Sequence, residues 1–357
     1  MRKTWLGMMG VAALLAACGG GGGGAGSTTG GSVQLPAGPK TYVAAKATVG
    51  DYYIFKTTDQ DLEPFPSQPT DTFSVRQIIS ASADGAHTVG YVRSVPIKNG
   101  TDYRTKSSTR DLDGLGHWLK NSYQSGSEEC VDTPTPVQYN IAPYTISVGT
   151  NWKYVGANTT KCSLSTNAQT TQIEADDSAV AEEEITVTAG TFKTIKVTDN
   201  ETQKYADVVD QFERTCWWEP ELGIEVKCTI KWTSTAPGMP KTVALQTREL
   251  YAYSNQKTGR KLDSKLRFLG AWNGSFDGTA SGTCKLLIRG AQVDGECIGA
   301  PAPLKVTGQV SDDGQLSLSM TYNGLAGQFT GKVDSLQQMS GTWSVPNYGS
   351  GTWVVKQ

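Results

Sequence analysis

Histidine is nearly absent from this sequence: His87 and His117 are the only two among 357 residues. No G-x-S-x-G elbow accompanies them, so a Ser-His-Asp hydrolase triad is not predicted. The cysteines show no C-x-x-C spacing, which together with so few histidines argues against a zinc site. We therefore expect surface or hydrogen-bonding roles for both histidines, with His117 in a loop.

The sequence also lacks a large excess of either positive or negative charge. The formal net charge is −2 and the isoelectric point is near 5.8, so the chain offers no basic field for nucleic acid. Asp59, Asp61 and Glu63 alternate like part of a calcium loop, but the glycine and the distal glutamate of such a loop are missing. A solvated turn is expected there.

Paired carboxylates for acid/base catalysis are not evident either. Asp176 and Asp177 are adjacent, and Glu182 to Glu184 form a run, but neither group has a second acidic cluster to complete a pair. The sequence therefore predicts no catalytic residue, no metal and no cofactor.

Long hydrophobic runs are missing except near the start. Leu6 to Ala17 is uncharged and follows a basic Arg2-Lys3 pair, and it is shorter than the roughly 20 residues of a membrane-spanning helix. This layout is typical of a cleavable signal over residues 1–17. Its end, Leu15-Ala16-Ala17-Cys18, resembles the lipobox of bacterial lipoproteins. The resemblance implies acylation of Cys18 and membrane attachment through acyl chains; a plain secretory signal with an incidental cysteine is the alternative.

The segment after Cys18 has the composition of a flexible tether. Residues Gly19 to Gly24 are all glycine, and Gly/Ser-rich sequence continues within the predicted tether, residues 18–40. Such a chain spans on the order of 20 Å. In the lipoprotein family that this region resembles, an aspartate after the cysteine signals inner-membrane retention. Gly19 at that place implies the outer membrane, with the protein periplasmic or surface-facing.

Six cysteines remain after Cys18, as expected for a disulfide framework in an oxidising compartment. Neighbour pairing is the simplest of the roughly 15 connectivities that six cysteines allow. The predicted pairs are Cys130–Cys162, Cys216–Cys228 and Cys284–Cys297.

Strand patterns dominate from Thr41 onward. Alternating runs such as 72–79 and 87–93, together with 40 glycines and 15 prolines, predict short antiparallel strands rather than helices. The polar stretch 167–184 is the exception, for which a short helix or a loop is expected. The fold class is therefore all-β, with a domain over residues 41–254 built as a curved sheet or half-barrel.

Two segments of this first domain begin alike. The run 49–55 (VGDYYIF) recurs in form as 148–154 (VGTNWKY), either through duplication or because two strands happen to start similarly. The runs 188–197 (TAGTFKTIKV) and 217–227 (WWEPELGIEVK) resemble signatures of uncharacterised bacterial envelope proteins. That resemblance covers residues 45–250 and implies a lipoprotein-carrier-like sheet around an apolar cavity.

A second domain follows a polar, basic linker at residues 255–264. Residues 265–357 hold a thrice-repeated Ser-Gly-Thr phrase and turn signals such as Asn323-Gly324, and about eight short strands fit. Eight strands are enough to close a small barrel. Gly270-Ala271-Trp272 is similar to the opening of lipocalin and avidin-type barrels, although strands this short favour a filled interior.

Three functions remain open at this stage. The chain carries an anchor, a tether and disulfides but no evident reactive group, which favours a non-catalytic binding or assembly lipoprotein with an envelope partner. A carrier of an apolar ligand in the 41–254 domain and a hydrolase of envelope polymers are the alternatives. Trp217 and Trp218 fall on opposite faces of any strand, so one serves core packing, domain contact, or stacking on carbohydrate or peptide.

The variant Cys18→Ser is expected to block acylation and leave an uncleaved precursor, because the processing enzyme of this class acts on the modified cysteine. Metabolic labelling with a palmitate analogue tests this. Label that persists in the variant would contradict the lipobox assignment.

Overall fold

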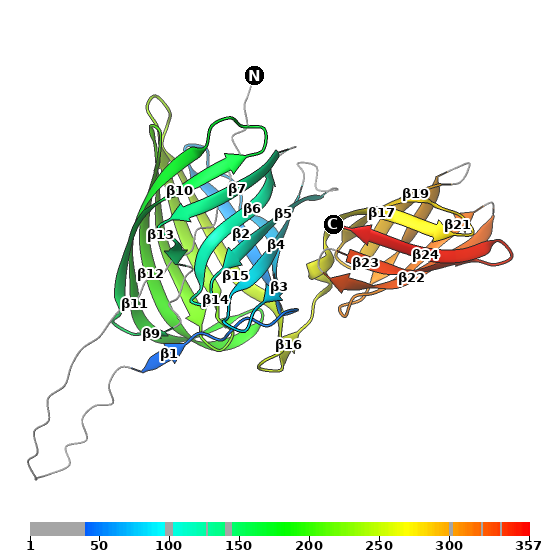
Figure 1. Cartoon of the computed structure of the whole chain (residues 1–357), viewed down its shortest axis with the longest axis horizontal. Coiled ribbons are helices and arrows are strands. Elements are labelled where there is room, and N and C mark those ends of the chain that lie inside the picture. The colour runs from blue at the N-terminus through cyan, green and yellow to red at the C-terminus, as the bar shows by residue number, and fades with distance from the viewer. Residues whose placement is uncertain are drawn as a thin grey trace, which may run out of the picture.

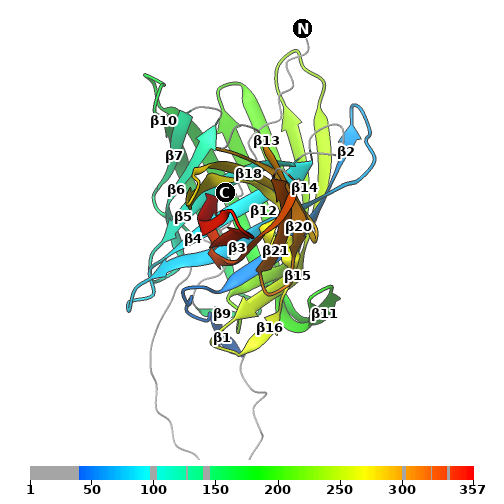
Figure 2. The ribbon, with the colours of Figure 1, turned by 90° about the vertical axis from the view of Figure 1, so that its right-hand side faces the viewer.

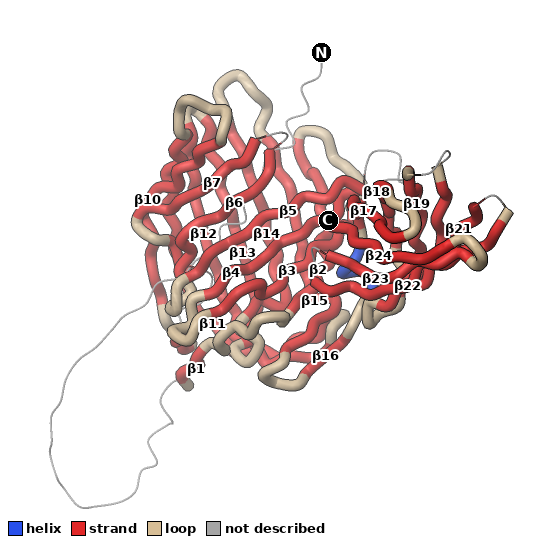
Figure 3. Tube along the Cα trace, turned by 45° about the vertical axis from the view of Figure 1, so that its right-hand side comes forward, coloured by secondary structure: helices blue, strands red, loops and turns tan. Residues whose placement is uncertain are grey.

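The computed structural model describes residues 40–96, 103–125, 128–139, 145–299, 303–322, 324–335 and 338–357. Cys18, the signal, Asn323 and all but the last residue of the predicted tether lie outside these residues. Two antiparallel β structures stand side by side, joined by the short 3-10 helix η1 (Lys265–Phe268) (Figures 1 and 2). The part of the chain that the structure describes contains no helix long and apolar enough to cross a membrane. The predicted all-β class is confirmed (Figure 3).

The larger structure is a sheet of 14 strands that closes on itself. Strands β8 (Gln138–Tyr139) and β16 (Arg260–Leu262) each pair with a single neighbour, and the remaining twelve form a circuit because β14 also pairs with β15. The predicted curved sheet is thus a complete barrel. Its strands are β2 (Tyr52–Glu63), β3 (Thr70–Ala81), β4 (His87–Pro96), β5 (Tyr103–Leu112), β6 (His117–Ser125), β7 (Glu128–Thr135), β10 (Asn151–Cys162), β11 (Gln169–Val187), β12 (Gly190–Tyr205), β13 (Val208–Glu219), β14 (Ile224–Thr235) and β15 (Thr242–Asn255).

The two halves of this barrel begin with the same local structure. Gly50 and Gly149 both adopt a φ of 91°, a left-handed conformation that favours glycine. The N–H of Gly50 donates to the carbonyl of Ile78 at 2.9 Å, and that of Gly149 donates to the carbonyl of Ala179 at 2.7 Å. The similar runs at 49–55 and 148–154 therefore form equivalent turns at the starts of β2 and β10.

A pair of short strands relates the halves further. Strand β1 (Thr41–Val43) precedes β2, strand β9 (Thr145–Ser147) precedes β10, and the two pair with each other antiparallel. The ladder is irregular at matching places, just after Ile78 in β3 and just after Ala179 in β11. These matches favour duplication of a six-stranded unit over a chance similarity.

Apolar side chains close the end of the barrel near β1. One buried cluster there includes Trp152 and Trp218, and a second includes Phe55 and Leu250. The segment after β1 crosses this end (Figure 1), where the N–H of Ala45 donates to the carbonyl of Pro220 at 3.0 Å. Because successive strands are antiparallel, the β2–β3, β10–β11 and β14–β15 connections all lie at the opposite rim.

The polar stretch 167–184 is not a short helix or a loop, as the sequence suggested, but most of the 19-residue strand β11. Its outward side chains face water, and Asp177 points into a charged interior. Alternation of apolar and polar residues is the usual signal of a half-buried strand. The signal is weak here because Asp177 interrupts the inward row of Ile173, Ala175 and Ala179, and two of these three side chains are small alanines.

The smaller structure is a closed barrel of eight antiparallel strands, as predicted. Each strand pairs with the next along the chain, and the last pairs with the first. The strands are β17 (Gly270–Gly278), β18 (Gly282–Arg289), β19 (Gln292–Ile298), β20 (Leu304–Val310), β21 (Gln315–Tyr322), β22 (Leu325–Ser335), β23 (Gln338–Val345) and β24 (Gly349–Lys356).

The interior of the small barrel is filled by side chains, in line with the sequence expectation. Trp272, Trp343 and Trp353 are buried in one apolar cluster, and each indole N–H donates to a backbone carbonyl. A recess of about 330 Å³, counted with the solvent at its mouth, remains where Phe276 and Tyr348 lie. This barrel therefore has little room for a large ligand.

Three disulfides fasten neighbouring strands, with the pairing that proximity predicted. Cys130–Cys162, Cys216–Cys228 and Cys284–Cys297 each join residues directly opposite one another in antiparallel ladders. Their Cα–Cα distances are 4.0, 4.1 and 4.0 Å. In the chain-entropy model, closing a loop of about 15 residues stabilises a fold by roughly 3 kcal/mol.

The segment between the barrels contacts both of them. Strand β16 continues the large sheet, so much of the predicted linker at 255–264 belongs to that sheet. Leu266 packs against an apolar patch on the outer wall that includes Tyr52 and Ile54. Two residues later, Phe268 is fully buried in the core of the small barrel.

A fragment of residues 265–357 is expected to fold alone, because its core, its closing strand pair and one disulfide lie within it. Thermal unfolding followed by tryptophan fluorescence should show one cooperative transition. The fragment exposes Leu266, so Leu266→Ser serves as a second version if solubility is poor. Solubility of both versions only in the presence of residues 40–262 would show that the barrels form a single folding unit.

Candidate functional site: a charged belt inside the large barrel

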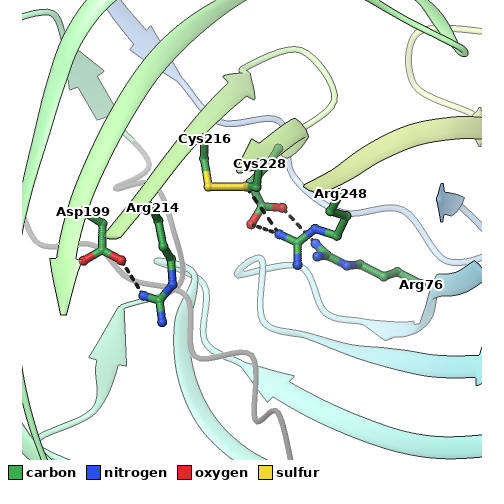
Figure 4. Close-up of a disulfide and its surroundings, with 7 residues drawn as sticks. Arg76, Asp199, Arg214, Cys216, Cys228 and Arg248 are labelled. Carbon is green, nitrogen blue, oxygen red and sulfur yellow. Dashed lines mark hydrogen bonds and ion pairs between the residues drawn. A yellow bond between two sulfur atoms is a disulfide. The ribbon is translucent and has the colours of Figure 1, made fainter. Parts of the chain in front are cut away.

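Charged side chains from β3, β12, β13, β14 and β15 lie inside the large barrel, and together with Asp177 of β11 we call them the charged belt (Figure 4). Asp177, Asp199 and Arg214 lie directly opposite one another across β11, β12 and β13, so they share one face of the sheet. Asp177 is 3% exposed and Asp199 is 6% exposed. Charges this deeply buried are costly unless they are paired or hydrogen-bonded.

One half of the belt is acidic. Arg214 donates to both oxygens of Glu201, at 3.0 and 3.1 Å, and also donates to Asp199. One guanidinium thus serves two carboxylates while Asp177 adds a third. Oδ2 of Asp177 and Oδ1 of Asp199 have no hydrogen-bond partner among the described residues. This half therefore contains more carboxyl groups than its one arginine pairs with.

Burial and the repulsion between neighbouring carboxylates raise the pKa of Asp177 and of Asp199. Burial raises the pKa of Asp177 to about 9, the charge of Asp199 adds to the shift, and the indole of Trp152 opposes it. Burial also raises the pKa of Asp199 to about 6, although Arg214 opposes that shift. Asp177 is accordingly protonated at neutral pH, as expected when carboxyls share a buried site.

The other half of the belt is basic. Glu225, which is 2% exposed, accepts hydrogen bonds from Arg76 at 2.9 Å and from Arg248 at 3.4 Å. Burial and the neighbouring charge of Arg76 lower the pKa of Arg248 to about 10. The two guanidiniums lower the pKa of Glu225 despite its burial. Two cations therefore share one anion.

Aromatic rings separate the arginines of this half. Arg76 lies 4.4 Å from the ring centre of Phe55 and 5.5 Å from that of Tyr91. Arg110 lies 5.3 Å from Tyr91 and 4.8 Å from Trp118. Cation–π contacts of this kind stabilise desolvated guanidiniums by about 2 kcal/mol. The basic half is thus a rigid, alternating stack of charges and rings.

The lining of this interior does not suit an apolar ligand. An apolar-ligand carrier needs a dry apolar cavity, whereas charged groups from β3, β11, β12, β13, β14 and β15 meet here (Figure 4). Hydrolysis by acid/base catalysis uses one protonated and one ionised carboxyl group. Asp177 is protonated here, and Glu201 is ionised in its pair with Arg214. Arg214 donates to both oxygens of Glu201 and also to Asp199, however, so both of these carboxylates are held by one guanidinium.

Neither histidine forms a triad. A ring nitrogen of His117 lies 2.6 Å from Asp113 in the turn before β6, and one of His87 lies 3.0 Å from the carbonyl of Gly85. His117 was expected in a loop, but it is buried and begins β6. Both roles are local hydrogen bonds. A group of candidate metal-ligand atoms contains Glu128 and a disulfide-bonded cysteine pair, whose sulfurs are not thiolates.

The acidic residues singled out by sequence separate in the structure. Asp59 accepts a hydrogen bond from Gln246 inside the barrel, and it belongs with Asp61 and Glu63 to strand β2 rather than to a turn. Asp176 faces outward beside Lys153. The prediction that Asp177 lacks an acidic partner was wrong, because strand pairing brings Asp199 to it.

The tandem tryptophans point to opposite faces, as predicted. Trp218 is buried in the closed end of the barrel. Trp217 is half-buried on the other face, where its indole N–H donates to Glu183 at 2.7 Å and Lys196 lies 5.6 Å from its ring centre. Its ring is thus already engaged by side chains of its own wall.

Sequence reasoning missed the basic half entirely. Arg76, Glu225 and Arg248 lie far apart in the chain, and no local spacing unites them. One usable signal was a polar or charged residue at every second position of a strand, in line with an apolar one. Gln246, Arg248 and Leu250 of β15 alternate in this way and all point inward. The outward phase of the same strand is polar too, so the pattern alone could not show which face is inside.

No protein-family model and no curated protein sequence matches this chain. Among solved structures, a protein described as a lipoprotein from Parabacteroides distasonis is 13% identical over 60% of this chain and 98% of its own, with a TM-score of 0.33. An exported protein with a YmcC-like fold from Bacteroides fragilis is 10% identical over 60% of this chain and 100% of its own (TM-score 0.30). The isotype 1 transferrin binding protein B from serogroup B Neisseria meningitidis is 10% identical over 89% and 78% (TM-score 0.17). Likeness at this level assigns no function.

The variant Asp177→Asn is expected to raise the melting temperature at about pH 8, with a smaller gain at about pH 5. The folded chain holds a proton on Asp177 up to a pKa of about 9, whereas the unfolded carboxyl releases it near about 3.9. Its contribution to stability is therefore complete below the lower value and is lost as pH rises through the higher one. Calorimetry at both pH values measures the effect.

The matched control is Glu184→Gln, an exposed carboxyl of the same strand. It should show no gain that grows with pH. An equal effect of Asp177→Asn at both pH values would contradict the raised pKa.

Proposed function

We propose that this chain is a non-catalytic binding or assembly protein of the bacterial envelope, anchored in the outer membrane through Cys18 and presenting its two barrels to a protein partner. The motif Leu15-Ala16-Ala17-Cys18 and the Gly-rich segment that follows support the anchor. Stable attachment takes more than one acyl chain, each methylene contributing about 0.8 kcal/mol.

The observation that carries the binding role is an apolar rim. The three most exposed large apolar side chains among the described residues are Phe65 (81%), Leu164 (71%) and Met239 (69%). Each lies at the tip of a connection at the same end of the large barrel: β2–β3, β10–β11 and β14–β15. Single exposed apolar residues are ordinary, but gathering of the most exposed ones at one rim favours an interaction surface.

Two of these tips are held rigidly next to each other. Phe65 stands between Pro64 and Pro66, and Met239 stands between Gly238 and Pro240. Strands β2 and β15 pair directly, and Lys241 approaches Glu63 at 3.3 Å. Proline restricts the free loops, so binding costs less conformational entropy. We call Phe65 and Met239 the rim pair.

The surroundings of the rim pair favour a protein partner over a lipid surface. Asp61 and Glu63 are exposed beside it, and carboxylates disfavour anionic phospholipid headgroups. The described part of the chain begins at Lys40, next to β1 (Thr41–Val43) at the opposite end of the barrel (Figure 1). A partner with apolar pockets for two side chains is therefore the occupant that we propose. The charged belt gives the apolar-carrier alternative no support.

A photo-crosslinking amino acid at position 65 tests this function in cells. We expect a discrete crosslinked protein band, because Phe65 would lie in the partner's pocket. The matched control carries the same crosslinker in place of Val155, which is exposed in the middle of the outer wall. Phe65→Ser combined with Met239→Ser should abolish binding of the captured protein without changing the melting temperature.

Equal capture from both positions, crosslinks only to lipid, or unchanged binding by the double variant would each contradict the proposal. The double variant alters only exposed side chains, so a loss of binding cannot be ascribed to unfolding when its melting curve is unchanged.

A further inference from the structure

The two guanidiniums at Glu225 have more N–H donors than the described protein atoms accept. Arg76 donates one hydrogen bond, to Glu225. Arg248 makes a long bond to Glu225 at 3.4 Å and a contact to the disulfide sulfur of Cys228 at 3.5 Å. Neither arginine has a further hydrogen-bond partner within the described ranges. No nitrogen of Arg76 or Arg248 is among the fully buried described atoms that lack a partner, so their remaining N–H groups face accessible space inside the barrel, where water or a ligand can accept their hydrogen bonds.

The charge at this place points to the kind of acceptor. Arg76 and Arg248 together bring two positive charges to the single carboxylate of Glu225. The side chain of Arg248 is only 7% exposed, and an unbalanced charge is costly in such surroundings. One further negative charge would make the group neutral.

The two guanidiniums are also held in fixed positions. Both lie against the ring of Phe55, at 4.4 Å for Arg76 and 5.6 Å for Arg248. Arg248 stands opposite Cys228 in the ladder, beside the disulfide to Cys216 (Figure 4). Groups that are fixed before a ligand arrives lose little entropy when it binds.

We propose that the interior of the large barrel binds a small ligand through its carboxylate, which bridges Arg76 and Arg248 beside Glu225. A planar carboxylate matches the two-pronged donor geometry of a guanidinium, and its single charge balances the group. A phosphate dianion would exceed that balance inside a barrel whose other half is already acidic. Phe55 and Tyr91 supply aromatic surface next to the site, so a ligand with an aromatic ring fits it best. This inference does not depend on the rim pair.

The test compares two probes of nearly equal shape, N-acetylphenylalanine and its amide. Isothermal titration calorimetry with the purified full chain should show at least tenfold tighter binding of the carboxylate. The informative variant is Arg248→Gln, because it leaves one arginine for one glutamate. It should lose at least tenfold in affinity for the carboxylate probe while the free protein melts at the same temperature or higher.

The matched control is Lys231→Gln on the outer wall of β14, which removes an exposed cation from the same barrel. It should bind the carboxylate probe as the parent does. A lower melting temperature of Arg248→Gln together with unchanged probe binding would show that Arg248 is only a structural ion pair. Equal affinity for the two probes, or no heat from either at the limit of solubility, would also overturn the proposal.

Discussion

Closure of the large sheet by the β14–β15 pairing is the constraint on which the rest of the structure depends. A barrel has no free strand edges, so its strands can be polar on both faces without offering a template for aggregation. Closure also encloses the inward charges, where ion pairs are shielded from bulk water and screening is weak. An open sheet would leave Arg76 and Glu225, from β3 and β14, far apart and solvated. The Arg76–Glu225 bond at 2.9 Å therefore exists because the sheet is closed.

The two similar halves of the barrel place different charges at matching inward positions. Arg76 stands two residues before Ile78, and Asp177 stands two residues before Ala179, at the matching hydrogen bonds of the two halves. The same inward position thus carries a cation in one half and an acid in the other. The second half supplies the counter-charges for both positions: Glu225 of β14 pairs with Arg76, and Arg214 of β13 pairs with Asp199 and Glu201. Such networks stabilise little by themselves, but they impose a fixed arrangement on the interior.

The apolar clusters, the rim pair and the small barrel occupy three different parts of the large barrel. Apolar clusters and strand β1 occupy one end of the large barrel, and the rim pair occupies the other. The small barrel is attached to the outer wall through Leu266 and Phe268 (Figure 2). This arrangement leaves the rim free of the segment that joins the two barrels.

The sequence alone determined the all-β class, the eight small-barrel strands and the neighbouring cysteine pairs, because these follow from local alternation, turns and spacing. It could not reveal the charged belt, since Arg76, Glu225 and Arg248 come together only through pairings between distant strands. The strand β11 was missed for a related reason: its inward face holds Ile173, Ala175 and Ala179, but Asp177 interrupts them and the alanines are small, so the apolar alternation is weak. Tertiary structure decided which polar face became an interior, because burial is a property of the closed barrel and not of any one strand.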